Sequence, residues 1–349
     1  SGGHPEHIPE LSWEQFVATH RRFYHPSNAR IFLDGHMQID EILRYIDEEY
    51  LSKYDYRAPD FDFSVQKPTT GEKTILYEAR EGEETLAHMA AAKILCSHKD
   101  VETIYAAKIL ADYLTGSNEA PLTRAFLERG LAQDVSLQIE DGVFQPNLCF
   151  LARNTVPENF TKIRETLAET ARSLVQSGLD REALAASLER FAFRRREISE
   201  PYGVTLALRA LDGWLYGDDP LTHIDSTKIF DSLRDRLDSD YFPKLLQTML
   251  ADAGDKVYLY ALPSTSKGRE DAQREAARAQ AQFAALDGNA QQRTREAVAS
   301  MQRWQQTPDS EEALCSLPHL ELADVPQEAA PIRTRETTLD GAPVLEVDT

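Results

Sequence analysis

Residues 134–176 read DVSLQIEDGVFQPNLCFLARNTVPENFTKIRETLAETARSLVQ, and this stretch decides the fold class of the chain. Two runs rich in strand-forming residues, at about 134–140 and 147–153, are separated by a turn at Asp141-Gly142. Apolar residues then recur every three or four positions: Phe160, Ile163, Leu167, Ala171 and Leu174. This spacing puts them on one face of a helix. The stretch therefore predicts two strands joined by a short turn, followed by a helix over 157–176.

The segments on either side continue this mixture of strands and helices. Towards the N-terminus, the sequence predicts strands at 73–79 and 85–95 and helices at about 100–114 and 120–129. Towards the C-terminus, it predicts helices from Asp180 to about 198, at 203–215, at 226–236 and at 239–252, and a strand at 256–261. Strands and helices mixed in this order are typical of an α+β fold, in which a layer of helices packs on a mostly antiparallel sheet.

Changes of composition divide the N-terminal part of the chain. Residues 1–54 predict a helix at 12–24, a buried strand at 29–33 and a helix at about 38–53. These elements are too few to form a core alone, and they suit the end of a larger domain. Residues 55–72 contain two Pro and no sustained period, so they predict a linker.

The α+β domain itself is predicted to cover residues 73–265. Residues 266–306 are rich in Ala, Gln, Arg and Glu with few large apolar side chains, which predicts a helical hairpin that links two bodies. Residues 307–349 predict an extended connector that ends in PVLEVDT, at 343–349, the first strand of a following domain without its partner. The chain has no initiator Met, and we expect it to be an internal segment of a longer polypeptide.

Composition favours a globular protein with a buried core, since 42% of residues are hydrophobic and 28% are charged. No apolar run approaches the roughly 20 residues that span a bilayer, so no membrane partner is predicted. The formal net charge of −20 argues against nucleic acid as a partner, because such binding needs Lys and Arg at the phosphates. Cys96, Cys149 and Cys315 are odd in number and far apart, which favours a reducing compartment, either the cytoplasm or an organelle matrix.

The histidines do not predict a metal centre. None of the nine lies in an H-x-x-E-H or H-E-x-x-H arrangement, in which a helix puts two imidazoles on one face to share a zinc ion. His4 and His7 are three residues apart, but the prolines around them favour an extended segment over a metal site. His20 and His25 lie near a predicted helix end, where packing or capping is the stronger interpretation.

Other polar clusters also have simpler explanations than a site. Gly217 and Pro220 predict a turn with helix-capping acids, which accounts for a cluster that resembles a metal site: Asp218, Asp219, His223 and Asp225. Ser117 lies outside any G-x-S-x-G motif, so it is not predicted to be a nucleophile. We predict no catalytic residue, no metal ligand and no cofactor in this chain.

Two further groups of large or charged side chains favour structural roles. The run Arg194-Arg195-Arg196 lies near Glu189 and Glu197, which predicts a solvated helix face with compensating carboxylates. Trp214 and Tyr216 lie at the end of the helix predicted at 203–215 and are expected to be core or domain-interface residues.

Five segments resemble segments of a known family, and they follow one another in the same order as in that family. LSWEQFVATHRRFYHPSNARIFLDG (11–35) is similar to the end of the first domain of the pitrilysin/insulinase-type metallopeptidases. Four segments further along the chain resemble the presequence-protease branch of that family: LTGSNEAPLTRAFLERGLAQDVS (114–136), GVFQPNLCFLARN (142–154), LALRALDGWLYGDDPL (206–221) and QQTPDSEEALCSLPHLELADV (305–325).

The resemblance implies a function for a longer parent protein. In that family two halves close around an unfolded peptide, and a first-domain H-x-x-E-H site binds the zinc ion. The chain would then hold the end of domain one, all of domain two and the linker hairpin. It would be a noncatalytic central segment of a peptide-degrading zinc metalloendopeptidase, with Zn²⁺ only in the parent. Its partners would be the remainder of the same polypeptide and unfolded peptide substrates.

Two other interpretations stay open at this point. The chain could be a relative of these peptidases that lost its metal site and serves as a scaffold or peptide-binding subunit. It could also be an unrelated α+β interaction domain whose hairpin at 267–306 mediates self-association.

Overall fold

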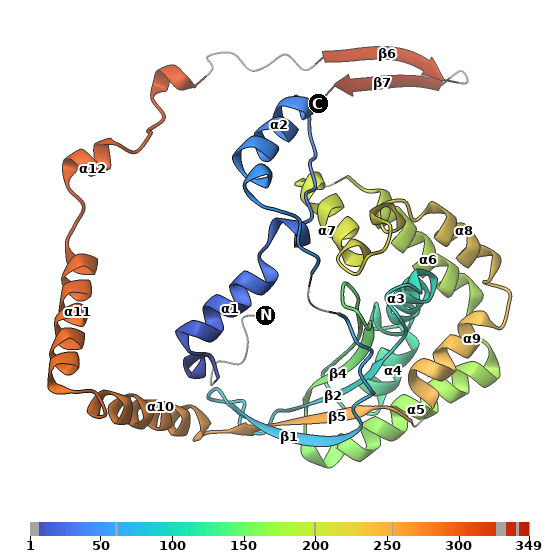
Figure 1. Cartoon of the computed structure of the whole chain (residues 1–349). Helices are drawn as coiled ribbons and strands as arrows, with labels where there is room; N and C mark the ends of the chain where they lie inside the picture. Colours follow the sequence, from blue (N-terminus) through green and yellow to red (C-terminus); the bar gives the residue numbers. More distant parts are fainter. Residues whose placement is uncertain are drawn as a thin grey trace. The chain divides into compact units, whose positions relative to one another are not determined.

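The structure of the chain is a computed structural model, which describes residues 7–59, 62–198, 200–252, 254–325, 333–339 and 342–348 (Figure 1). It divides into two compact units, residues 1–271 and 272–349. Among the described residues no helix is long and apolar enough to cross a membrane.

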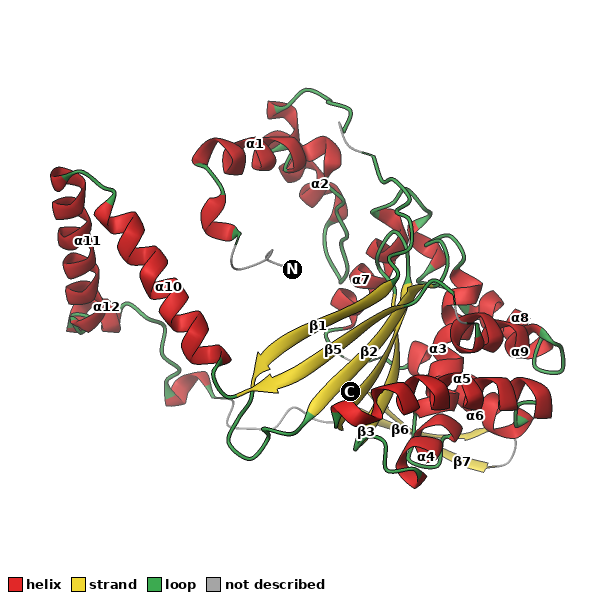
Figure 2. Cartoon of the chain, turned by 90° about the horizontal axis from the view of Figure 1, so that it is seen from below, coloured by secondary structure: helices red, strands yellow, loops and turns green. Residues whose placement is uncertain are grey.

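The first unit is built on a five-stranded sheet with the order β1-β5-β2-β4-β3 (Figure 2). Its strands are β1 (Gly71–Glu78), β2 (Ala87–Ile94), β3 (Asp134–Glu140), β4 (Asn147–Thr155) and β5 (Val257–Ser264). Only the β1–β5 pair is parallel, and the other pairs are antiparallel. The predicted α+β class with a mostly antiparallel sheet is confirmed.

Helices cover one face of this sheet, as Figure 2 shows for α3 to α6. They are α3 (Val101–Thr115), α4 (Pro121–Glu128), α5 (Phe160–Ser177), α6 (Arg181–Arg196), α7 (Tyr202–Trp214), α8 (Thr227–Asp235) and α9 (Tyr241–Leu246), and α9 continues into a π-helical turn (Gln247–Ala251). Helix α3 buries residues around most of its circumference, as a central helix must. Phe126, Phe150 and Phe242 are fully buried between the helices and the sheet.

The N-terminal segment carries α1 (Trp13–Phe23) and α2 (Ile39–Glu49), neither of which buries any residue. Ser12 and Gln15 form the capping box that begins α1. The predicted strand at 29–33 is wrong, because this extended run pairs with no described strand. It packs along α7 instead.

Two contacts fix this packing along α7. The Arg30 guanidinium lies 5.8 Å from the Trp214 ring centroid. At the other end of α7, a side chain on Gly203 would collide with the Asp34 carboxylate. Glycine in the first turn of α7 therefore leaves room for the Asp34 carboxylate beside the N-terminus of the helix.

The second unit contains most of α10 (Lys267–Ala284), then α11 (Gly288–Gln306), α12 (Glu311–Cys315), β6 (Arg333–Leu339) and β7 (Ala342–Asp348). The two helices predicted between 266 and 306 are confirmed, and the Arg295 guanidinium lies 5.1 Å from the Phe283 ring centroid near their turn. The predicted lack of a partner for the last strand is wrong, because β7 pairs antiparallel with β6. The partner strand RTRETTL is mainly polar and so lacks the apolar signal on which strand prediction depends.

Short 3₁₀ turns complete the described secondary structure. They lie at Ile8–Glu10, Pro26–Asn28, Leu51–Lys53, Pro157–Asn159, Pro220–Thr222 and Leu322–Asp324.

Candidate functional site

The sheet presents an apolar face on the side away from the helices. Along β4, Leu148, Phe150 and Ala152 are buried, whereas the residues between them are only half-buried. The same alternation runs along the first half of β2. An antiparallel sheet with one covered face usually carries polar side chains on the other. Here that second face is mainly apolar at its centre.

Strand register shows which side chains meet on this face. One row across the sheet contains Lys73, Leu259, Ala90, Leu151 and Ser136. The next row contains Gly71, Val257, Ala92, Cys149 and Gln138. We call the central part of these two rows the apolar trough, and define it as Ala90, Ala92, Cys149, Leu151, Val257 and Leu259. All six residues are half-buried.

The trough is lowest along β2. Ala90 and Ala92 carry a single methyl each, whereas the flanking positions on β5 and β4 carry longer side chains. Neighbouring strands are about 4.8 Å apart, so the two flanks stand about 10 Å from each other across the alanines. The register therefore sets two alanine methyl groups between longer side chains on the two neighbouring strands.

A histidine lies at one end of the trough. His88 is opposite Ala261 on β5, and its Nδ1 accepts a hydrogen bond of 3.2 Å from the backbone N–H of Asn154. The neutral ring must therefore carry its proton on Nε2. Burial, and then the positive charge of Arg153, lowers the pKa of His88. No partner of Nε2 is recorded among the described residues, so this N–H remains a donor on the open face.

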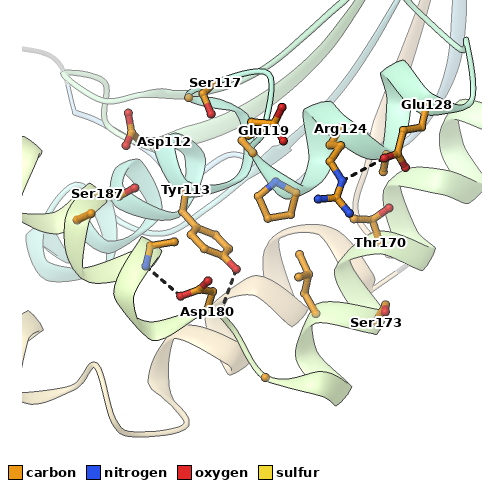
Figure 3. A pocket seen from close by; sticks show the side chains of 18 of the residues that line it. Asp112, Tyr113, Ser117, Glu119, Arg124, Glu128, Thr170, Ser173, Asp180 and Ser187 are labelled. Atoms are coloured by element: carbon orange, nitrogen blue, oxygen red, sulfur yellow. Dashed lines mark hydrogen bonds and ion pairs between the residues drawn. The ribbon is translucent and has the colours of Figure 1, made fainter.

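A separate hollow of about 750 Å³ lies among α3, α4, α5 and α6 (Figure 3). The Tyr113 hydroxyl points into it and accepts a hydrogen bond of 3.2 Å from the backbone N–H of Asp180. Its arginines are already paired across the rim: Arg190 with Asp112 at 2.6 Å, Arg124 with Glu128 at 3.2 Å and Arg129 with Glu169 at 3.4 Å. The three arginines therefore have partners, and these pairs favour helix packing over ligand capture.

Ser117 lies on the rim of this hollow, as Figure 3 shows. Among the described residues no side-chain hydrogen bond to a base is recorded for it. A serine without a neighbouring base is a poor nucleophile, so the structure gives no support to such a role.

A half-buried group of charges joins α3, α6 and α7, and we call it the charged cluster: Lys108, Asp141, Arg195 and Asp212. The Arg195 guanidinium lies 5.2 Å from the Tyr105 ring centroid and donates a hydrogen bond to the His223 carbonyl. Lys108 Nζ is 2.5 Å from an Asp141 carboxylate oxygen. Burial, and then the charge of Asp141, raises the pKa of Asp212. These contacts join α3 to the turn after β3 through Asp141, and α6 to the loop that contains His223.

The prediction for the arginine run is therefore wrong at its centre. Arg194 and Arg196 are exposed, but Arg195 turns into the domain. Glu189 pairs directly with Arg234 at 2.6 Å, which lowers the pKa of Glu189, and the positive charge of Arg196 in the run lowers that pKa further. Nothing in the local sequence distinguishes the middle arginine from its neighbours.

The predicted capping acids are confirmed in part. Asp219 accepts a hydrogen bond from the N–H of Leu221 at 2.9 Å, and Asp225 accepts one from the N–H of Thr227 at 3.1 Å. Asp218 instead lies 2.6 Å from Nδ1 of His98, a buried partner 120 residues away. In the part of the chain that the structure describes, no group of three His, Cys, Asp or Glu residues could hold a metal ion.

His7, His20 and His25 have partners in their own segments of the chain. His4 lies outside the described residues, and His7 Nδ1 is 2.9 Å from the Glu10 carboxylate. His20 stacks on Tyr24 at 4.7 Å, and His25 accepts a hydrogen bond from the N–H of Ser27.

The aromatic residues at the end of α7 pack at an interface, as predicted. Trp214 contacts Arg30 of the N-terminal segment. The Tyr216 ring packs 4.9 Å from that of Phe63 and 5.6 Å from that of Phe144, and its hydroxyl donates to the carbonyl of Gly142.

Comparison with known families identifies this architecture. Residues 10–191, just over half of the chain, match the peptidase M16 inactive domain, and residues 262–349 match the associated domain of subfamily C of the same peptidases. The chain therefore belongs to the peptidase M16 family, and the matching domain is of the noncatalytic type. Its relatives place it in the presequence-protease branch of that family, as the sequence resemblance implied.

Two relatives align with the whole chain. Protein HypA of Clostridium perfringens is 30% identical, and presequence protease 1, chloroplastic/mitochondrial, of Arabidopsis thaliana is 29% identical; each alignment covers 100% of this chain. The chain spans only 36% and 34% of their respective lengths.

Solved structures share the fold at low identity. A protease from Helicobacter pylori has a TM-score of 0.59 at 14% identity, over 75% of this chain and 61% of that one. A peptidase M16 inactive domain from Pseudomonas fluorescens has a TM-score of 0.55 at 15% identity, over 75% of this chain and 60% of that one.

Proposed function

We propose that this chain is the noncatalytic central segment of a zinc metalloendopeptidase that degrades peptides. In this proposal the open face of the sheet forms part of the wall of a peptide chamber, and α10 and α11 form the hinge between the two halves. The observation that carries the proposal is the apolar open face, which occurs in a domain of the inactive M16 type. A wall of this kind would hold an unfolded peptide without reacting with it.

The residues present do not fit a zinc centre of their own. The sequence has no H-x-x-E-H motif, and the described residues contain no group of three potential ligands. A catalytic zinc site needs three protein ligands and an open position for water. The proposal therefore assigns the zinc ion to the remainder of the polypeptide and assigns no chemical step to this chain.

The first test compares the purified chain with its full-length polypeptide in a peptide-hydrolysis assay with added Zn²⁺. We expect no hydrolysis by the chain alone, because it lacks the ligands that activate water. The full-length polypeptide should cleave the same peptide, and a chelator should abolish that cleavage. Chelator-sensitive cleavage by the purified chain, absent from a mock preparation, would contradict the proposal.

A second candidate follows from the same apolar face. A relative without its metal site could use the face as a peptide-binding or scaffold subunit. The coding sequence upstream of Ser1 separates the two: H-x-x-E-H with a later Glu supports the enzyme, and the same region without those ligands supports the binding subunit. In either case the proposed partners are unfolded peptides and the rest of the polypeptide, in a reducing compartment that suits the three free cysteines.

A further inference from the structure

We propose that the apolar trough binds an extended peptide segment through two bulky apolar side chains spaced two residues apart, with the Nε2–H of His88 donating to a backbone carbonyl of that segment. This inference rests on the proposed function and gives its chamber wall a specific subsite. It assigns the floor of the subsite to Ala90 and Ala92.

The spacing of the trough matches an extended chain. Ala90 and Ala92 point to the same side of β2, and positions two apart on a strand are separated by about 6.8 Å. A peptide lying parallel to β2 repeats its own inward side chains at the same distance. One bulky side chain can therefore lie over each alanine, between the flanks that β4 and β5 provide.

The width of the trough excludes two other occupants. Its flanks stand about 10 Å apart between backbones, whereas a helix with side chains is about 10–12 Å wide and could not reach the alanine floor. A second copy of this face would set one alanine floor against another. The unfilled volume between the floors would carry the cost of a cavity.

The end of the trough supplies a polar contact suited to a peptide. The Asn154 amide fixes the His88 ring so that Nε2 carries the proton. The Tyr77 ring lies 5.2 Å from the imidazole and limits its movement. A neutral donor at this position can bind a backbone carbonyl, and it anchors the peptide where the apolar floor ends.

These features define a preference among peptides. Leu, Met or Phe at both inward positions would fill the space over the alanines and gain from burial. Alanine at those positions would leave the space unfilled. Asp or Glu would lose hydration over the alanine floor, so acidic residues at these positions are disfavoured.

The test measures binding of fluorescein-labelled peptides to the purified chain by anisotropy. The probe carries a Ser-Leu-Ser-Leu-Ser core, and its matched peptide carries Ser-Ala-Ser-Ala-Ser. We expect the leucine probe to bind at least tenfold more tightly than the alanine peptide. Ala92→Leu fills the floor while keeping it apolar, and it should weaken binding of the leucine probe at least tenfold.

Two further variants complete the design. Ala183→Leu adds the same side chain to an exposed position of α6 and should leave probe affinity unchanged. His88→Phe keeps a ring but removes the donor, and it should weaken binding several-fold. Circular dichroism and the melting temperature of each variant show whether it retains the fold.

Each outcome decides the inference. Unchanged or tighter binding by a folded Ala92→Leu variant would overturn it, since an apolar surface without a channel would then suffice. Equal affinity for the two peptides, or no binding of either, would overturn it as well. None of these results affects the hydrolysis comparison between the chain and the full-length polypeptide, which tests the proposed function separately.

Discussion

Arg195→Met is expected to destabilise the α+β domain by about 2–3 kcal/mol, whereas Arg194→Met and Arg196→Met should each change its stability by less than about 0.5 kcal/mol. The three residues are consecutive in α6 and carry the same charge. Only Arg195 turns inward, where it donates to the His223 carbonyl and lies over the Tyr105 ring.

The size of this effect follows from the charges that the variant leaves behind. Burial lowers the pKa of Arg195, so its charged state is held by its neighbours and not by water. Without it, Asp212 and Asp141 would share only the Lys108 ammonium among the members of the charged cluster. Removing one partner of a buried group of charges lowers the free energy of unfolding by more than the whole group contributes, because the charge that remains is buried without a partner.

A double-mutant cycle separates charge from packing. Asp212→Asn keeps the shape of the side chain and removes the charge that Arg195 offsets. We expect the pair Arg195→Met with Asp212→Asn to lose less stability than the sum of the single variants, by about 1 kcal/mol or more. Urea unfolding monitored by circular dichroism measures the free energy of unfolding of the natural chain, the two single variants and the double variant. Equal losses for Arg194, Arg195 and Arg196 variants would show that the cluster does not stabilise the fold.

Much of the fold could be predicted because its signals are local. The stretch at 134–176 forms β3, β4 and α5 as its periodicity predicts, and Gly178 follows α5 with a φ of 87°, where glycine avoids strain. Asp180 caps the next helix through the N–H of Ala183. The start of α5 differs by three residues, since Pro157–Asn159 forms a 3₁₀ turn instead.

Features that depend on distant partners could not be predicted in this way. The apolar run Ile31-Phe32-Leu33 has the composition of a strand, but strand formation also needs a neighbouring strand, and none of those described lies beside it. Some partners lie far apart in the same chain, such as His98 and Asp218, and the sequence around either residue does not indicate the other.

The candidate site was missed for the same reason. Residues 87–94, AHMAAAKI, are poor in strand-forming side chains, and the sequence alone assigns no role to their alanines. The trough exists because register sets Leu259 on one side of Ala90 and Leu151 on the other. Register between strands is set by the whole sheet, so a reading of one segment cannot show it.

Lys256→Met is expected to make the stability of the domain less dependent on pH above pH 8. Lys256 is 8% exposed, and its Nζ donates to the carbonyls of Leu250 and Asp252 at 2.6 and 2.7 Å. These two bonds close the π-helical turn at Gln247–Ala251. Burial, and then the positive charge of Lys93, lowers the pKa of Lys256 from 10.5 to about 8.

The sign of the effect follows from proton binding. Between pH 8 and pH 10.5 the unfolded chain keeps the Lys256 proton that the folded chain has released, so the unfolded state binds more protons. Stability contributed by this residue therefore rises with pH across that window. The lowering of its pKa corresponds to about 3 kcal/mol, which is the most that the rise can reach.

The measurement is the free energy of unfolding of the natural chain minus that of Lys256→Met, determined by urea titration at pH 7.5, 9 and 10.5. Tyrosines and other groups titrate in both proteins, so the difference isolates Lys256. Lys244→Met removes an exposed charge from α9 and serves as the reference. We expect the difference to move by about 2–3 kcal/mol in favour of the natural chain as pH rises. A flat or falling difference would mean that the two carbonyls stabilise the ammonium at least as much as burial penalises it.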